Sequence, residues 1–178
     1  MRIDAIVRQP ETIFIDHAKE EQRSCMSAEQ QMLELGIHLT AAKAPAGNYV
    51  SAIQSGNLVF TSGRAPIPVD GKAAKGQLGR EYSTNDGYDL ARSACLDLLA
   101  VLKHQLGSLD KIARFIELRG AINAVPEFEE HAKVLDGASD LLVEIFGPAG
   151  VHVRSVIGVN SLRSGVPLTL KATVEVIG

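Results

Sequence analysis

The sequence predicts one α+β domain that combines two amphipathic helices with a sheet that has one buried side. Apolar residues recur every three or four positions between residues 91 and 106, and again between residues 128 and 145, which is the spacing of amphipathic helices. Residues 168–176 alternate strictly between apolar and polar, as in a strand that buries one face. A chain of 178 residues usually forms a single domain.

Composition and charge argue against several classes of function. The net charge of -3 supplies no overall attraction for a polyanion. A chain with no tryptophan, three tyrosines and five phenylalanines also has few platforms for stacking bases, which argues against nucleic acid as a partner. No apolar run approaches the roughly 20 residues of a membrane span, and the N-terminus lacks the apolar core of a signal peptide. We therefore expect a cytoplasmic protein without membrane contact, with Cys25 and Cys95 as free thiols.

Residues 1–26 are predicted to be a partly ordered N-terminal extension, because they are polar, are broken by a proline and end in a run of charges. The folded domain is expected to comprise residues 27–178. It opens with Ser27-Ala28-Glu29-Gln30, a capping box in which the serine and glutamine side chains satisfy the first amides of a short helix. Gly36 stands at the usual position after the end of that helix.

The remaining elements follow from turn signals and periodicity. Residues 49–53 and 58–61 are predicted to form a β-hairpin around the turn cluster Ser55-Gly56-Asn57. The two helices should end at Gly107 and at Gly147. Further strands are expected at residues 112–122, 151–159 and 168–176. The predicted order of elements after the first short helix is β-β-α-β-α-β-β.

Arg154 is the first candidate for a functional residue. It lies in the predicted strand 151–159, in an otherwise apolar segment, and His152 shares its face. A lone strand arginine can be a surface residue that keeps its charge in water. It can also be a fixed guanidinium fork that binds a carboxylate through two parallel hydrogen bonds. No phosphate-binding glycine loop, HExxH motif or nucleophile elbow occurs, so neither a cofactor nor a metal is expected.

An ordered series of segments resembles the Rid (reactive intermediate deaminase) family, also called YjgF-like or endoribonuclease L-PSP. The matching segments are Ala46 to Val50, Gly56 to Gly63, Val125 to Phe128, Ser139 to Gly147, His152 to Val156 and Val166 to Leu168. The resemblance implies a chorismate-mutase-like α+β fold, with a mixed sheet and two helices on one of its faces. It also implies a homotrimer with the sheets packed inward and a ligand cleft at each subunit interface.

The resemblance further implies an activity and a set of site residues. The activity is hydrolysis of reactive enamines and imines derived from amino acids, which gives 2-keto acids and ammonia without a cofactor. Arg154 matches the family's carboxylate-binding arginine, Tyr49 matches a tyrosine near the cleft, and Ser62 and Gly63 match the pair that lines it. Val156 stands where a cysteine is common, and its backbone carbonyl is the group expected to hold water.

One departure from the family pattern affects the chemistry. Thr169 stands where the family has a water-orienting glutamate, and Lys171 replaces a second acidic residue. Glu175, the nearest acid on that face, would lie about 20 Å away at roughly 3.3 Å per residue. A positioned acid or base contributes about 10² to 10⁴ in rate, and a threonine hydroxyl can hold a water but cannot take its proton. Asp136 also stands where an asparagine is common.

Three functions therefore compete. The first is an enzyme in which Arg154 anchors the carboxylate of an imino acid, while the Val156 carbonyl and the Thr169 hydroxyl hold the attacking water. Such imines already hydrolyse in water, so positioning alone is useful. The second is a trimer that binds a small carboxylate, such as a keto acid, without catalysis. The third and weakest is a ribonuclease, because the net charge is negative and aromatic residues are few.

Overall fold

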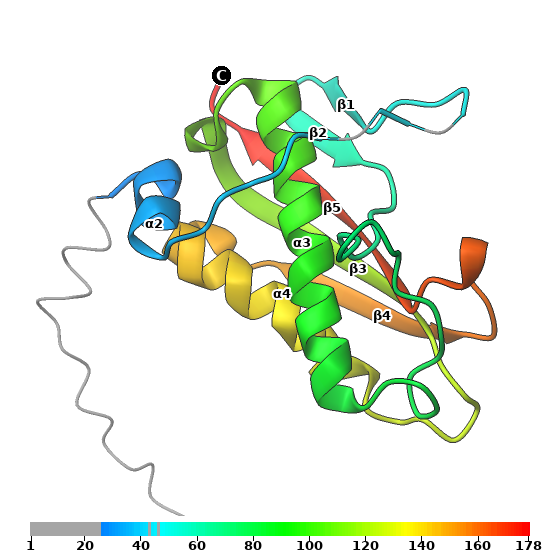
Figure 1. The fold of residues 1–178 in the computed structure, drawn as a ribbon. Coiled ribbons are helices and arrows are strands. Elements are labelled where there is room, and N and C mark those ends of the chain that lie inside the picture. The colour runs from blue at the N-terminus through cyan, green and yellow to red at the C-terminus, as the bar shows by residue number, and fades with distance from the viewer. Residues whose placement is uncertain (1–25, 43, 46) are drawn as a thin grey trace, which may run out of the picture.

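The computed structural model describes residues 26–42, 44–45 and 47–178, and within them a five-stranded sheet carries two long helices across one face (Figure 1). The strands are β1 (Ala52–Ser55), β2 (Leu58–Thr61), β3 (Ile112–Asn123), β4 (Val153–Val159) and β5 (Leu168–Val176). The helices are α2 (Ala28–Glu34), α3 (Thr84–Leu106) and α4 (His131–Phe146), with short 3-10 turns η1 (Leu109–Lys111), η2 (Gly147–Gly150) and η3 (Arg163–Gly165). Apart from Met26, the predicted N-terminal extension lies outside the described residues, as does Cys25.

The sheet is mixed, as the resemblance implies. Its strands lie in the order β1-β2-β5-β3-β4, so β1 and β4 are the two edges. β3 and β4 run parallel, whereas the other neighbouring pairs are antiparallel. A parallel pair needs a crossover connection, and α4 supplies it between β3 and β4. The predicted α+β class, the mixed sheet and the two helices on one face are confirmed. No helix in the described part of the chain is both long enough and apolar enough to span a membrane.

Local sequence signals determine where the helices begin and end. The predicted capping box at Ser27 is present, and Gly36 follows α2 with a φ of 66°. α3 begins at Thr84, well before the apolar repeat that predicted it, because Ser83 and Asp86 form a second capping box. It ends at Gly107, whose φ of 82° suits glycine. α4 begins at His131, three residues later than its apolar pattern indicated.

The predicted hairpin is confirmed, but its first strand is displaced along the chain. The prediction was residues 49–53, whereas β1 comprises Ala52–Ser55. The reason is the tight two-residue turn at Gly56 and Asn57, which pairs Ser55 with Leu58 and Ala52 with Thr61. The four residues of β2 therefore find their partners at positions 52 to 55. Gly56 has a φ of 61°, which suits this turn.

The core lies between the sheet and the two long helices. It includes Leu98 and Leu102 of α3, Leu135 and Leu142 of α4, Leu118 of β3 and Leu170 of β5, all of them fully buried. The two helices also touch through their backbones at Gly137 of α4. A Cβ atom at that position would overlap the carbonyl oxygen of Tyr88 in α3. This close approach explains a glycine in the middle of a helix, where it costs about 1 kcal/mol relative to alanine.

The opposite face of the sheet is not covered by any element of the described residues. The predicted alternation of β5 is confirmed, because Leu168, Leu170, Ala172, Val174 and Val176 are buried against the helices while the residues between them face outward. On the outward face, Ile53 and Phe60 are exposed near one edge, and Val153 and Ile157 are exposed at the other, with Val153 67% accessible. Charged side chains such as Arg119 and Lys171 lie between these apolar edges.

Candidate functional site

Four polar side chains meet where α4 passes the edge strand β4; we call Asp136, Ser139, His152 and Arg154 the Arg154 cluster. The Nη1 atom of Arg154 donates to Asp136 Oδ1 at 2.6 Å and to Ser139 Oγ at 3.3 Å. Ser139 Oγ also lies 3.1 Å from His152 Nε2, and His152 Nδ1 lies 2.6 Å from the carbonyl oxygen of Gly150. Asp136 and Ser139 come from one turn of α4, whereas His152 and Arg154 come from β4 and the residue just before it.

Two glycines allow α4 and β4 to approach each other this closely. A Cβ atom at Gly150 would overlap the carbonyl oxygen of Leu142 in α4. A Cβ atom at Gly158 would lie 2.5 Å from Nε2 of His131, at the other end of the same helix. The strand and the helix therefore run side by side in opposite directions, so Arg154, between the two glycines, faces α4.

The hydrogen bonds indicate which tautomer the neutral His152 ring adopts. The carbonyl oxygen of Gly150 can only accept, so His152 Nδ1 carries the proton. In the neutral ring Nε2 is then an acceptor, and it takes the hydroxyl proton of Ser139. The Arg154 guanidinium in turn donates to the lone pairs of Ser139 Oγ. A hydroxyl, a base and a third group that orients the base are thus in hydrogen-bond contact, which is the arrangement of an activated hydroxyl.

A second group of predicted residues lies where β2 ends beside the start of β5; we call Ser62, Gly63 and Thr169 the Thr169 cluster. A Cβ atom at Gly63 would stand 3.8 Å from the Cβ of Thr169, which is an ordinary contact. The Ser62 hydroxyl donates to the carbonyl of Val50 at 2.6 Å. Tyr49, one residue before Val50, is half exposed at 49%.

A buried ion pair fixes the backbone beside the Thr169 cluster. Arg64 Nε lies 2.6 Å from Asp97 Oδ2 of α3, and their side chains are only 11% and 13% exposed. Arg64 also exchanges two backbone hydrogen bonds with Leu170 of β5, at 2.6 and 2.8 Å. Gly63, which directly precedes Arg64, is thereby held against the start of β5.

One chain does not bring the two clusters together. Arg154 pairs across the sheet with Leu118, whereas Thr169 pairs with Ala121, three positions further along β3. Because successive strand residues point to opposite faces, Arg154 faces the helices and Thr169 faces outward. β4 and β5 are also separated by β3. Val156 pairs with Gly120 and shares the helix-facing side with Arg154. Within one chain, the Thr169 hydroxyl and the Arg154 guanidinium therefore lie on opposite faces of the sheet.

The interaction that sequence reasoning did not identify is the contact between Ser139 and His152. Both residues lie inside segments that resemble the family, and strand alternation places His152 on the face of Arg154. Their pairing depends on η2, the tight turn that returns the chain from α4 to β4, and no sequence period indicates it. The sequence distinguishes Asp136 only by its difference from the family's asparagine, although it lies one helical turn before Ser139.

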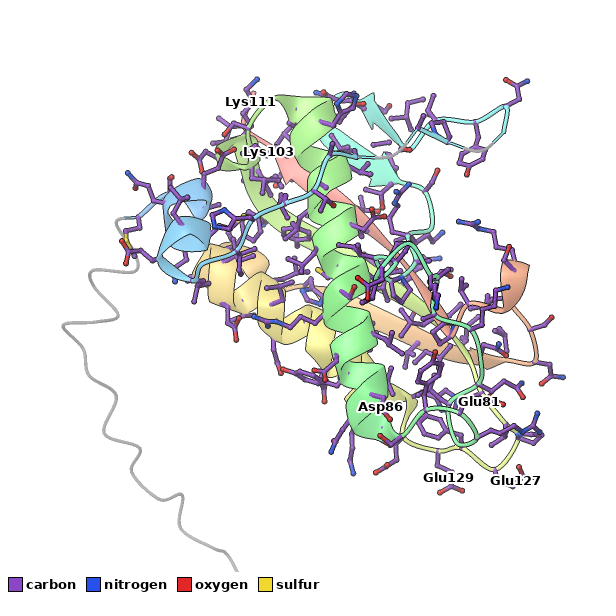
Figure 2. The ribbon with its side chains drawn as sticks, in the orientation of Figure 1. Glu81, Asp86, Lys103, Lys111, Glu127 and Glu129 are labelled. Carbon is purple, nitrogen blue, oxygen red and sulfur yellow. The ribbon has the colours of Figure 1, made fainter. Side chains whose placement is uncertain are left out.

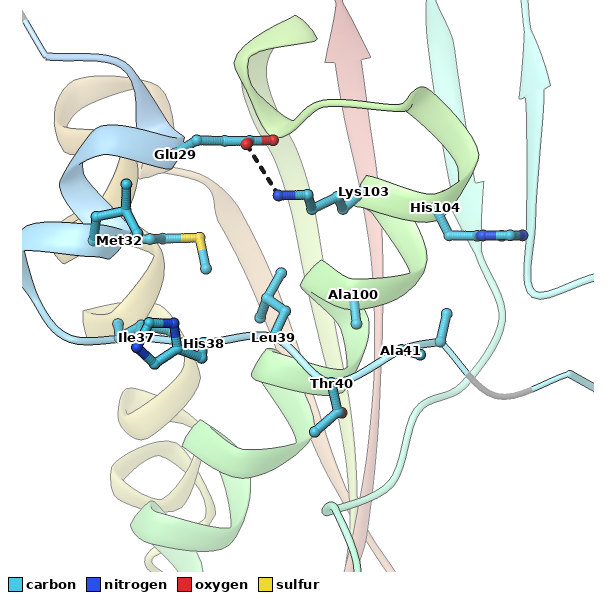
Figure 3. A pocket seen from close by; sticks show the side chains of 12 residues that line it. Glu29, Met32, Ile37, His38, Leu39, Thr40, Ala41, Ala100, Lys103 and His104 are labelled. Carbon is cyan, nitrogen blue, oxygen red and sulfur yellow. Dashed lines mark hydrogen bonds and ion pairs between the residues drawn. The ribbon is translucent and has the colours of Figure 1, made fainter.

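A surface hollow lies elsewhere on the described part of the molecule. A groove of about 710 Å³ runs between α2, the segment after it and the outer side of α3 (Figure 3). Its wall includes Met32, Leu39 and Ala100, and the ion pair between Lys103 and Glu29 spans its rim at 3.0 Å. None of the site residues predicted from the sequence lines it. We interpret this groove as the seam where the 37–42 segment crosses α3, separate from the candidate site.

Other reactive groups in the described residues do not form a competing centre. Burial raises the pKa of the Cys95 thiol to about 12, so this cysteine stays protonated and is a poor nucleophile at neutral pH. Within the described ranges, no three histidine, cysteine, aspartate or glutamate side chains are grouped as they would be around a metal ion.

Comparison with known proteins agrees with the fold and the order of the motifs. The sequence pattern of the family described as "YjgF/chorismate mutase-like, putative endoribonuclease" matches residues 29–171. Protein TCP17 of Trypanosoma cruzi is 39% identical over 142 residues, which cover 79% of this chain and 89% of that protein.

Two solved structures are similar over most of their length. A "putative endoribonuclease" from Shewanella oneidensis has 35% identity and a TM-score of 0.81, covering 85% of this chain and 100% of that one. A protein of unknown function from Agrobacterium tumefaciens has 34% identity and a TM-score of 0.77, covering 92% and 100%. The chain therefore belongs to the YjgF-like family, also called the Rid or endoribonuclease L-PSP family, and this membership supports a Rid-like or endoribonuclease-like role.

Proposed function

We propose that this protein is a cytoplasmic homotrimer that hydrolyses a small imine or enamine bearing a carboxylate to a 2-keto acid and ammonia. The observation that carries the proposal is the separation of the two clusters. Arg154 faces the helices at one edge of the sheet, whereas Thr169 lies two strands away on the outward face, and Ser62 and Gly63 follow β2, one strand further. Each chain thus offers two halves of a cleft, which a neighbouring copy can complete.

The uncovered face of the sheet supports the trimer. It carries exposed apolar side chains at both edges, including Phe60 and Ile157, with charged residues between them. Large apolar side chains that are exposed on one face favour a partner that covers them. A closed threefold arrangement would bury the face of every copy and would form three equivalent clefts. Light scattering should give three times the monomer mass, and a stable monomer at micromolar concentration would contradict the assembly.

In the proposed cleft, Arg154 holds the carboxylate of the substrate. Its hydrogen bonds to the described side chains both use Nη1, so the other guanidinium N–H groups can bind a ligand. The Val156 carbonyl and the Thr169 hydroxyl of the adjoining copy would hold a water beside the imine carbon. Because such imines hydrolyse readily in water, fixing the water and the carbon at contact distance already accelerates the reaction.

Mixed trimers test whether the cleft is shared between chains. Arg154→Ala should lose carboxylate binding, since a charged hydrogen bond contributes about 1.5 to 3 kcal/mol. Gly63→Leu should block the other half of the cleft, and the position accepts a side chain because its Cβ would meet only Thr169, at 3.8 Å. Each variant alone should release little ammonia from 2-iminobutyrate. When both are coexpressed, random assortment gives a wild-type cleft at about one interface in four, and about a quarter of the activity should return.

The outcomes of the mixing experiment are distinct. Recovery of activity only on coexpression supports a cleft shared between subunits. The two variants could instead stay inactive when coexpressed, although both fold and form mixed trimers. That result would place the whole site within one chain. As a control for a lost surface charge, Arg92→Ala removes an arginine of α3 that pairs with Glu144 at 2.7 Å. Arg92 belongs to neither cluster. It should keep full activity.

A second candidate function is carboxylate binding without catalysis. Thr169 and Lys171 in place of the family's acidic residues favour it, because neither is a carboxylate that could accept a proton from water. Ammonia release from 2-iminobutyrate separates the two functions. A protein that binds 2-oxobutyrate in calorimetry but does not speed ammonia release would be a binding protein.

The endoribonuclease-like role is the remaining alternative, and the net charge of -3 argues against it. Figure 2 shows Glu81, Asp86, Glu127 and Glu129 gathered at the end of the molecule where α3 begins, whereas Lys103 and Lys111 lie at the other end. An RNA-binding surface would need a continuous basic stripe. RNA affinity that falls steeply with salt would indicate phosphate contacts and would revive this function.

A further inference from the structure

We propose that Ser139 and His152 form a proton relay that replaces the missing acid at position 169. The inference rests on the proposed imine hydrolysis and names groups for its proton transfer. Thr169 can orient a water but cannot accept a proton from it. His152 of the Arg154 cluster can accept that proton through the Ser139 hydroxyl, which it contacts.

The relay is already assembled in a single chain. Ser139 Oγ lies 3.1 Å from His152 Nε2, and the protonated Nδ1 of His152 donates to the Gly150 carbonyl at 2.6 Å. Gly150 is buried, and its fit against the Leu142 carbonyl fixes the position of the acceptor. The ring is thus held with its basic nitrogen toward the serine, as in hydroxyls activated by a histidine whose orientation a third group sets.

The relay stands next to the proposed carboxylate anchor. Nη1 of Arg154 lies 3.3 Å from Ser139 Oγ. In a 2-imino acid, the imine carbon is bonded directly to the carboxylate carbon, so a carboxylate held by Arg154 carries the reacting carbon toward the same hydroxyl. Ser139 and His152 are both half-buried, and the Arg154 side chain is 33% exposed, so a small substrate can reach them while bulk water is partly excluded.

The charged and titratable side chains that face the relay come from both packed elements. From α4, Asp136 binds Arg154 at 2.6 Å, and His131, which lies against Gly158, is eight residues before Ser139 and so more than two helical turns away. From β4, Arg154 itself places a positive charge beside Ser139 Oγ. This charge favours the partly deprotonated serine oxygen during proton transfer.

The proposed steps balance as follows for a protonated imine. Water attacks the imine carbon, a C–O bond forms, and the C=N pair returns to nitrogen. The proton released by water passes to Ser139 Oγ while the serine proton moves to His152 Nε2. The imidazolium then returns a proton by the same path to the amino group of the carbinolamine. The C–N bond breaks, the oxygen lone pair forms the carbonyl, and ammonia takes the remaining hydroxyl proton and leaves as ammonium beside the keto acid.

Kinetics of Ser139→Ala and His152→Ala test the relay. A positioned acid or base contributes about 10² to 10⁴ in rate, so kcat on 2-iminobutyrate should fall about 100-fold in both variants. The affinity for 2-oxobutyrate, measured by calorimetry, should change less than about threefold, because Arg154 still provides the charged contact. Added imidazole should restore part of the His152→Ala rate and none of the Ser139→Ala rate. Such a rescue would not follow from a purely structural role.

His104→Ala serves as the matched control. His104 is an exposed histidine on the outer side of α3, and it lines the groove between α2 and α3. It should keep the wild-type kcat and should not respond to imidazole.

If Ser139→Ala and His152→Ala retain kcat while Arg154→Ala loses it, the relay is refuted and the proposed hydrolase stands. If the wild-type protein does not accelerate ammonia release, the hydrolase and the relay both fail. Since Ser139→Ala only removes one oxygen, it remains informative if His152→Ala does not fold.

Discussion

The carboxylate of Asp136 lies 2.6 Å from Nη1 of Arg154, so the candidate carboxylate anchor has a counter-ion within its own chain. The two side chains are 42% and 33% exposed, respectively. Ion pairs this accessible to solvent contribute about 0 to 1 kcal/mol. An incoming carboxylate would therefore meet a guanidinium that is oriented by Asp136 and partly neutralised by it.

Asp136→Asn should tighten the binding of small carboxylates. The amide can still accept a hydrogen bond from Nη1, but the competing negative charge is gone. The expected gain in affinity for 2-oxobutyrate is about two- to fivefold, the equivalent of a solvent-exposed ion pair, measured by calorimetry. Asp140→Asn, which changes a carboxylate on the same helix that accepts from the Tyr88 hydroxyl, is the control and should have no effect. Weaker binding by Asp136→Asn would show that the charge positions the arginine more than it competes.

Thr169→Glu should raise the rate of imine hydrolysis. Position 169 is on the outward face of β5, opposite Ala121 and beside Gly63, so a longer side chain enters the proposed cleft and not the core. A carboxylate there can accept a proton from water, and we expect a gain of about tenfold, less than the roughly 10² to 10⁴ that a fully positioned base provides. Some affinity should be lost if the new carboxylate pairs with Arg154 of a neighbouring copy. Thr169→Gln has a similar shape without the charge and should show no gain. A trimeric Thr169→Glu that binds keto acids without faster turnover would show that the missing glutamate does not limit the protein.

Gly137→Ala should destabilise the fold strongly. The new methyl group would overlap the carbonyl oxygen of Tyr88, so α3 and α4 would have to move apart. Overpacking of this kind costs about 1 to 3 kcal/mol or more in the free energy of unfolding. Chemical denaturation provides the measurement. Gly63→Ala is the matched control, because its Cβ meets only an ordinary contact at 3.8 Å, and it should stay within about 0.5 kcal/mol of the wild type.

Stability in acid should depend on Glu29, which attaches α2 to the rest of the domain. The hydrogen bond from Lys103 lowers the pKa of the Glu29 carboxyl below its ordinary value of 4.5, and donors from the Leu109 amide and the Ser108 hydroxyl act in the same direction against partial burial. A carboxyl whose pKa is lower in the folded state stabilises the fold at pH values above its pKa in the unfolded chain. This contribution is lost as the pH falls through the pKa of the folded state. The free energy of unfolding should therefore decline below about pH 4.5 in the wild type and decline less in Glu29→Gln. Glu34→Gln, on the exposed side of the same helix, should retain the wild-type profile.

Much of the fold could be predicted because periodicity records which face of each element is buried. Residues 168–176 alternate so strictly that the buried and outward sets of β5 were predictable residue by residue. Residues 84–90 contain little apolar repetition, so the first turns of α3 depended on the capping pair of Ser83 and Asp86 instead. The start of β1 was predicted too early because register depends on the turn at Gly56, and a residue's intrinsic preference for strands does not reveal its partner.

The site was predictable only in part. Arg154 is notable in the sequence because it interrupts an apolar strand, and its face follows from alternation. Its contacts with Asp136 and Ser139 depend on the way α4 packs against β4, which two glycines permit. The relation between Arg154 and Thr169 depends on the order of strands in the sheet and, in the proposed trimer, on a second chain. Periodicity within one strand carries no information about the order of the strands or about a neighbouring chain.

Arg154 belongs to β4, which stands at the end of the sheet and, among the described strands, pairs with β3 alone. Edge strands open more readily than central ones, so brief separation of β4 would displace the guanidinium and the adjacent histidine while the interior remained intact. Ligand binding would then oppose this local opening and slow the exchange of β4 amide hydrogens with solvent. The affinity of the site and the rigidity of one strand would therefore change together, and substitutions that loosen the edge would weaken binding without touching the ligand.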